Sequence, residues 1–243
     1  DRHHGIGGDG IILIEKSDIA DAKVRVFNLD GSEAKMGGNA LRSVAKYLYD
    51  NGEVKKEVID LEMGGAVISV QTYTINGKVS SACVNMGRVD FSPKFMKMKL
   101  DVGKMIDYPI EVGGKYYHVT CLSIGNPHCV LFRDRVDELN VPEIGPLFEH
   151  ASVFKNRMNT EFVRVVNETT LKMRVWERGN GETYACGSGA CAAAVAAVEN
   201  GYCKKDTDIT VKVKGGDLIV RYTDDTVYLT GNTKLVYNGI LEY

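Results

Sequence analysis

Two segments of the chain repeat each other at a spacing of 149 residues. The first, DAKVRVFNLDGSEAKMGGNALRSVAKYLYDNG, runs from Asp21 to Gly52, and it aligns without a gap to TLKMRVWERGNGETYACGSGACAAAVAAVENG, which runs from Thr170 to Gly201. Eight of the 32 positions are identical, and each segment has the same order of strand, glycine-rich turn, apolar helix and terminator. Such self-similarity indicates an internal duplication. The sequence therefore predicts two similar halves.

Most of the chain consists of short segments typical of β-strands. Alternating or β-branched runs occupy 11–14, 24–27, 67–74, 116–122, 162–166, 171–176, 209–213, 218–222 and 226–229. Several are joined by pairs such as Asn76-Gly77 and Gly215-Gly216, which are typical of hairpin turns. Only 39–50 and 187–200 have helical length and composition, and each ends in Asn-Gly, which favours a helix C-terminus. The pattern predicts antiparallel sheets with one buried helix in each half.

Charge and composition exclude several classes of function. The chain has 243 residues, with 30 Lys+Arg against 32 Asp+Glu, so it lacks the basic excess of a nucleic-acid or membrane-surface protein. No apolar run approaches the roughly 20 residues of a membrane-spanning helix. The six cysteines form no CxxC or other metal-ligand spacing, so we expect free thiols and no metal. These features favour a cytoplasmic protein.

Each half is expected to present a glycine-rich loop that leads into the N-terminus of an apolar helix. The backbone amides of such a helix start have no partner within the helix, and the macrodipole adds partial positive charge. Two helix starts that face each other would bind a carboxylate and favour a thiolate. The alternative is that these turns only solve a packing problem, and the duplication weighs against it.

Cys186 is the candidate for chemistry because it lies directly before the turn Gly187-Ser188-Gly189. At a helix start we expect the pKa of its thiol to be depressed, which would make it a base or a nucleophile. Cys191 lies inside the Ala-rich helix and is interpreted as structural. The same interpretation applies to Cys83, Cys121, Cys129 and Cys203.

Five blocks of sequence then give a specific resemblance. DRHHGIGGDG (1–10), NLDGSEAKMGGNALR (28–42), IGNPHCV (124–130), RMNTEFV (157–163) and WERGNGETYACGSGACAAA (176–194) resemble, in the same order, the signature blocks of the diaminopimelate epimerase family. The resemblance implies an α/β (α+β) fold of two pseudo-symmetric halves, each an antiparallel β-sheet wrapped around a central helix, with the substrate bound between them. We place the first half at 1–88, with a C-terminal strand at 232–243 that returns to it, and the second half at 89–231.

The resemblance also implies a reaction. Family members interconvert LL- and meso-2,6-diaminopimelate without a cofactor, in lysine and cell-wall precursor biosynthesis. Two cysteines flank the α-carbon: one as a thiolate removes the proton, and the other as a thiol returns a proton from the opposite face. The implied partner is a small-molecule substrate, a homodimer is compatible with the resemblance, and no metal, nucleic acid or membrane is expected.

The family positions map onto this chain residue by residue. Cys186 matches one catalytic cysteine, while His128 and Glu177 match polar residues that tune the cysteines and contact the substrate α-amino group. The loops that hold the α-carboxylate match Gly187, Ser188, Gly38 and Asn39, and further substrate-binding positions match Asn28, Asn126, Asn159 and Arg178. Arg178 suits the distal carboxylate as a bidentate partner. Without the surrounding blocks, His128 would be interpreted as a turn residue and Glu177-Arg178 as a solvated pair.

The chain departs from the family pattern at position 37. The family block reads Met-Cys-Gly-Asn, whereas this chain reads Met36-Gly37-Gly38-Asn39, so Gly37 stands in place of the other catalytic cysteine. The duplication leads to the same position, because Gly37 aligns with Cys186. The chain also opens inside the first family block, which we interpret as part of a longer sequence.

Gly37 leaves several functions open. An engineered or erroneous glycine would leave the natural protein an ordinary epimerase, whereas a natural paralogue would perform one-sided chemistry from Cys186. We expect the chain as written to bind diaminopimelate and to epimerise it very poorly. The alternatives are an amino-acid racemase of the same fold, a lyase that uses Cys186 as its only base, and a non-catalytic amino-acid-binding protein.

Overall fold

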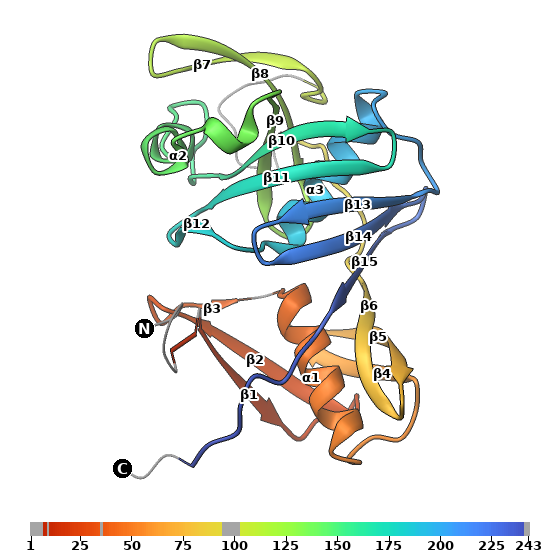
Figure 1. Ribbon diagram of the computed structural model, residues 1–243. Coiled ribbons are helices and arrows are strands. Elements are labelled where there is room, and N and C mark those ends of the chain that lie inside the picture. The colour runs from red at the N-terminus through yellow and green to blue at the C-terminus, as the bar shows by residue number, and fades with distance from the viewer. Residues whose placement is uncertain (1–6, 9, 35, 94–102, 241–243) are drawn as a thin grey trace. The chain divides into compact units, whose positions relative to one another are not determined.

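The computed structural model of the chain describes residues 7–8, 10–34, 36–93 and 103–240 (Figure 1). The chain divides into two compact units: Asp1–Ala34, Asn39–Val84 and Thr230–Tyr243 form the first, and Lys35–Gly38 and Asn85–Leu229 form the second. The chain thus leaves the first unit after Val84, slightly before the boundary expected at 88, and it re-enters that unit at Thr230. Of the first family block, residues 1–6 and 9 lie outside the described residues.

The first unit is a sheet with one helix. Its elements are β1 (Gly10–Glu15), β2 (Ala22–Asn28), β3 (Glu33–Ala34), α1 (Gly38–Asp50), β4 (Val58–Met63), β5 (Ala66–Ile75) and β6 (Lys78–Asn85). The strands follow the order β1-β2-β4-β5-β6, and β3 pairs with β2. A left-handed pair, Asn76 at φ 53° and Gly77 at φ 75°, closes the hairpin between β5 and β6, as the sequence predicted.

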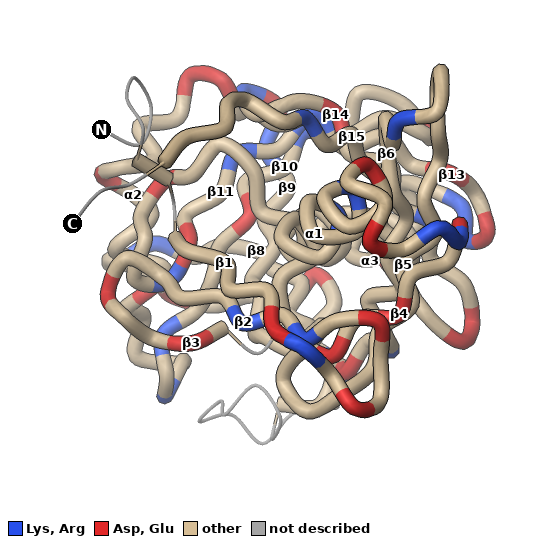
Figure 2. Tube along the Cα trace, turned by 90° about the horizontal axis from the view of Figure 1, so that it is seen from below, with Lys and Arg blue, Asp and Glu red and all other residues tan. Residues whose placement is uncertain are grey.

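The second unit is larger and contains the other two α-helices of the described chain. Its elements are β7 (Tyr108–Val112), β8 (Lys115–Ser123), β9 (Pro127–Phe132), the 3-10 turn η1 (Val136–Glu138), α2 (Val141–Glu149), β10 (Asn159–Asn167), β11 (Thr170–Glu177), β12 (Gly181–Thr183), α3 (Gly187–Glu199), β13 (Asp208–Val213), β14 (Gly216–Tyr222) and β15 (Val227–Asn232). The strands follow the order β15-β14-β13-β11-β10-β9-β8-β7, and β12 pairs with β11. Charges of both signs are scattered along the chain (Figure 2).

The structure confirms the duplication. Helix α1 spans Gly38–Asp50 and helix α3 spans Gly187–Glu199, so both ends keep the spacing of 149 residues seen in the sequence. An ion pair repeats as well: Arg25 Nε lies 2.9 Å from Glu33 Oε1, and Arg174 Nε lies 2.8 Å from Glu182 Oε1. In both units this pair links two consecutive strands that precede the helix: β2 and β3 before α1, and β11 and β12 before α3.

The sheets are mixed, which corrects the expectation of purely antiparallel pairing. Strand β2 is parallel to β4, and β11 is parallel to β13, because a helix connects each pair and brings the chain back to the same end of the sheet. Strands β9 and β10 are also parallel. The connection between them contains α2, which the sequence analysis missed because Pro142 and Pro146 interrupt its helical pattern.

The two repeated helices are buried to different degrees. Helix α3 contacts β8, β9, β10, β11, β13 and β14, and all of its residues from Ala190 to Ala197 are buried. This confirms the expectation of a central helix surrounded by sheet. Helix α1 instead buries Leu41, Ala45 and Leu48 and exposes Ser43 and Tyr47, so it is amphipathic rather than apolar on all sides.

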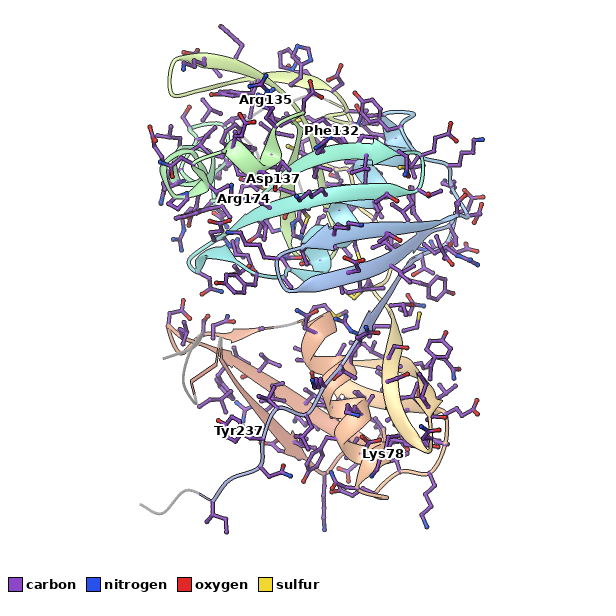
Figure 3. All side chains as sticks on the ribbon, in the orientation of Figure 1. Lys78, Phe132, Arg135, Asp137, Arg174 and Tyr237 are labelled. Atoms are coloured by element: carbon purple, nitrogen blue, oxygen red, sulfur yellow. The ribbon has the colours of Figure 1, made fainter. Side chains whose placement is uncertain are left out.

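The repeated ion pair offers a matched test of how burial changes the contribution of an ion pair to stability. The side chains of Arg174 and Glu182 are 12% and 14% exposed, against 36% and 43% for Arg25 and Glu33. Arg174 also donates through Nη1 to the carbonyl of Leu139 at 2.5 Å, and Figure 3 shows it beside Asp137 of η1. We expect Arg174→Ala to lower the free energy of unfolding in urea by about 2–3 kcal/mol, because buried acceptors lose their donor. Arg25→Ala should have a clearly smaller effect, and equal losses would contradict this account.

Candidate functional site

Cys186 forms the N-cap of α3, as the sequence suggested. Its backbone is extended, at φ −118° and ψ 114°, and the chain turns into the helix at Gly187. The Cys186 Sγ accepts a hydrogen bond from the Gly189 amide at 3.3 Å and lies 3.6 Å from the Ser188 hydroxyl. The thiol therefore takes the place that a Ser or Asp side chain usually occupies at a helix start.

The pKa of Cys186 departs from the expectation. Burial raises the pKa of this thiol well above its usual value, and the negative charges of Glu177 and Glu161 raise it further. The hydrogen bonds from Ser188 and Gly189 act in the opposite direction but do not outweigh these effects. The expected depressed pKa is therefore wrong for this site. These effects favour the thiol over the thiolate, because a helix start stabilises a thiolate less than burial beside two carboxylates destabilises it.

At Gly189, in the turn after Cys186, a larger residue would meet close neighbours. A Cβ atom on Gly189 would lie 2.8 Å from Glu161 Oε1 and 3.2 Å from Cys186 Sγ. The helix start therefore brings a thiol and a carboxylate against the same backbone position. Gly187 is buried and Ser188 is half-buried at the first turn of the helix, where amides are free to bind an anion.

Glu177 and Arg178 lie where β11 turns into β12. Thr183, on β12, donates its hydroxyl to Glu177 Oε1. The backbone amide of Arg178 donates to Asn159 Oδ1 at 2.9 Å, and the Arg178 guanidinium is exposed and donates to the Asn156 carbonyl at 3.2 Å. Buried Glu149 supports the same turn by accepting from the Gly179 amide at 3.1 Å.

Asn126, His128 and Asn159 connect this turn to the start of β9. Asn159 donates to the Pro127 carbonyl at 2.9 Å, so its side chain bridges the β9 start and Arg178. His128 is fully buried, with Nε2 2.9 Å from Asn126 Oδ1 and Nδ1 2.7 Å from Glu161 Oε1. Within the second unit the structure thus connects Cys186, the helix start, His128, Asn126, Asn159 and the turn at Arg178.

The remaining predicted site residues lie elsewhere in the chain. Asn28 ends β2 and donates to the Ser32 hydroxyl at 3.0 Å, and Asn39, in the first turn of α1, accepts from Arg42 Nη2 at 2.7 Å. Both belong to the first unit. Gly37 and Gly38 are grouped with the second unit, where a Cβ on Gly38 would lie 2.9 Å from the Leu229 side chain. A side chain at Gly38 would therefore require the Leu229 and Met86 side chains to move.

Sequence reasoning missed Glu161. It lies in the block RMNTEFV, but its neighbours Thr160 and Phe162 are also fully buried, so the strand lacks the alternation that marks a solvent face. Phe162 belongs to the apolar cluster with Phe148 of α2, whereas Glu161 points toward α3. The signal available in the sequence was an acidic residue directly before the apolar pair Phe162-Val163.

No group of three or more His, Cys, Asp or Glu side chains among the described residues is arranged to hold a metal ion. None of the helices within the described ranges has both the length and the apolar character of a membrane span.

Solved structures with low sequence identity share this fold. A hydroxyproline epimerase from Agrobacterium vitis matches with a TM-score of 0.68 at 13% identity, over 92% of this chain and 71% of that one. A phenazine biosynthesis protein of the PhzF family from Bacillus anthracis matches with a TM-score of 0.67 at 14% identity, over 94% of this chain and 84% of that one. The fold is therefore the mixed α/β architecture of racemase- and epimerase-like proteins.

Closer relatives narrow this class to a family. The family model for diaminopimelate epimerase matches residues 1–92 and 120–236. The diaminopimelate epimerase of Acetivibrio thermocellus is 46% identical over 98% of this chain and 85% of its own length, and that of Desulfovibrio desulfuricans is 44% identical over the same shares. The chain belongs to the diaminopimelate epimerase family. It is an isomerase of the epimerase type, and its substrate is a small molecule.

Proposed function

We propose that the chain binds 2,6-diaminopimelate and interconverts its LL and meso forms, in the pathway to lysine and cell-wall precursors. The observation that carries this proposal is the Cys186 thiol at the first turn of α3, buried beside Glu177 and Glu161. The identity to named epimerases over nearly the whole chain supports the substrate.

The helix start is suited to the α-carboxylate of the substrate. The free amides of the first turn and the partial positive charge of α3 favour an anion next to Cys186. When the α-proton leaves, negative charge spreads from the α-carbon onto this carboxylate. The same amides then stabilise the carbanion more strongly than the substrate, which is the condition for catalysis.

Polar groups around the helix start suit the rest of the substrate. Glu177, oriented by the Thr183 hydroxyl, is suited to accept from the α-ammonium group. Arg178 has an exposed guanidinium on a turn fixed by Asn159 and Glu149, so it can form a bidentate pair with the distal carboxylate. Asn126, directly before β9, supplies an amide group for a further contact.

The proposed proton transfers need two groups with opposite protonation. A base on one face takes the α-proton, and an acid on the other face delivers its own proton to the carbanion. Cys186 fills the acid role, because burial and the charges of Glu177 and Glu161 favour its protonated form. Gly37, at the position of the second cysteine, has no side chain to serve as the base. We therefore propose that this chain binds substrate but turns it over very slowly.

Incubation with LL-diaminopimelate in deuterated water tests this function. We expect calorimetry to detect binding, proton NMR to show slow exchange at the α-carbon, and chromatography to show very little meso product. Absence of binding would contradict the proposed substrate, and fast turnover would contradict the requirement for two thiols. An unsaturated or keto-acid product would instead indicate a lyase, and turnover of amino acids without a distal carboxylate would indicate a racemase.

A further inference from the structure

Glu161 is a buried carboxylate that the proposed reaction has not used. Its side chain is 0% exposed, and one of its oxygens, Oε2, has no hydrogen-bond partner among the residues that the structure describes. An unpartnered buried carboxylate oxygen costs free energy that a neutral residue of the same size would avoid. The position therefore calls for a functional explanation.

Glu161 controls the His128 ring. In the parallel pair of β9 and β10, Asn159 lies opposite His128, and Glu161 follows two residues later on the same face of the strand. Its Oε1 lies 2.7 Å from His128 Nδ1, while Asn126 Oδ1 lies 2.9 Å from Nε2. Because Nε2 donates to Asn126, the short contact at Nδ1 contains one proton that the imidazole and the carboxylate share. The ring is thus fixed at both ends.

Glu161 also lies against the start of α3. Its Oε1 and the Cys186 Sγ are 2.8 Å and 3.2 Å from the position that a Cβ of Gly189 would occupy. Burial raises the pKa of Glu161 above its usual value, and the charge and hydrogen bond of His128 offset only part of this rise. The groups that face Cys186 are Glu161 from β10, Glu177 from β11, and the Ser188 hydroxyl and Gly189 amide from α3, with His128 of β9 behind Glu161.

We propose that Glu161 is a positioning residue of the active site, which fixes the orientation of the His128 ring and places its carboxylate against the Cys186 thiol across Gly189. Its first effect is that His128 keeps one proton between Nδ1 and Oε1. Its second effect is that Cys186 stays protonated and is ready to donate. The value of this arrangement for catalysis rests on the proposed function, but both effects can be measured without any turnover.

The test compares Glu161→Gln with Glu149→Gln in the full chain. Glu149 is the matched control because it is also a buried glutamate. Its carboxylate accepts hydrogen bonds from Trp176, Arg157 and Gly179, and it is not among the charges that act on Cys186. The first measurement is the rate of Cys186 alkylation by iodoacetamide against pH, read by peptide mass spectrometry. The second is nitrogen–proton NMR of labelled histidine, which reports which ring nitrogens of His128 carry protons.

In Glu161→Gln we expect the alkylation profile of Cys186 to move to lower pH by up to about half a unit, because the carboxylate is the member of the neutral His128–Glu161 pair that faces the thiol, and the variant removes it. We also expect the His128 signals to become those of a neutral ring with its proton on Nε2. Glu149→Gln should leave both readouts as in the parent. Unchanged readouts in Glu161→Gln, or equal changes in both variants, would overturn the proposal.

If Glu161→Gln fails to fold, the same measurements on Glu161→Asp test whether Glu161 positions the His128 ring. The shorter side chain keeps the charge but withdraws the oxygen from Nδ1, so the His128 signals should change while the Cys186 profile stays near that of the parent. Unchanged His128 signals would overturn the proposal. Because neither measurement requires epimerisation, a failure of the proposed function would be recognised separately, by the absence of diaminopimelate binding.

Discussion

Replacing Gly37 by cysteine is expected to raise kcat/KM for the epimerisation of LL-diaminopimelate by about 10²–10⁴-fold, the usual contribution of a positioned general base. The reason is the protonation state of the remaining thiol. Cys186 is held as an acid by burial and by two carboxylates, so the chain as written has a proton donor without a base. A second thiol at position 37 would supply the missing group. The rate is measured by the appearance of the meso isomer.

Gly37→Ala and Gly37→Ser are the controls for this gain. Alanine fills the same backbone position without a titratable group. Serine supplies a hydroxyl, which does not lose its proton at neutral pH and therefore cannot act as the base. Neither variant should gain more than a small factor in rate. An increase with alanine equal to that with cysteine would show that the gain comes from rigidity of the loop and not from the thiol.

Removing Cys186 in the Gly37→Cys background should abolish most of the gained activity. We expect Cys186→Ala to lower kcat by about three orders of magnitude with little change in KM, because groups that act as a unit lose most of their effect when either is removed. Substrate binding should persist, since the helix-start amides remain. The measurement is steady-state kinetics of the double variant beside calorimetry with the LL isomer.

Cys191→Ala is the matched control on the same helix. Cys191 is fully buried within α3, and its replacement removes a thiol without touching the helix start. Activity of the Gly37→Cys protein should therefore change by less than about tenfold. If Cys191→Ala were as damaging as Cys186→Ala, the loss would reflect damage to the helix, and the assignment of the chemistry to Cys186 would be contradicted.

The repeat was the most informative part of the sequence for the fold. It predicted both long helices and their ends, because Asn-Gly terminators and glycine-rich turns act locally on the backbone. Strand direction was predicted less well. Parallel pairing depends on where a crossover helix returns the chain, and no local pattern in β2 or β11 records that geometry. Helix α2 was missed because it is held by the apolar cluster around Phe148 and not by its own helical propensity.

For the candidate site, position and ionisation differed in how well they could be predicted. The N-cap place of Cys186 followed from the turn after it, and the structure confirms that place. Its pKa did not follow, because burial and the charges of Glu177 and Glu161 come from two separate strands and a helix that only the fold assembles. Glu161 was missed for the same reason, since its function depends on the contact with His128 across two strands.

The last strand of the described chain belongs to both units. The first residues of β15, up to Leu229, complete the sheet of the second unit, and the residues from Thr230 belong to the first. The Val227 carbonyl accepts from the Met86 amide, and the Thr233 amide donates to the Ser80 carbonyl, so both ends of the strand are held. The residues from Thr230 are therefore part of the folded first unit, and a chain that ended at Leu229 would lose the Thr233–Ser80 hydrogen bond of that unit.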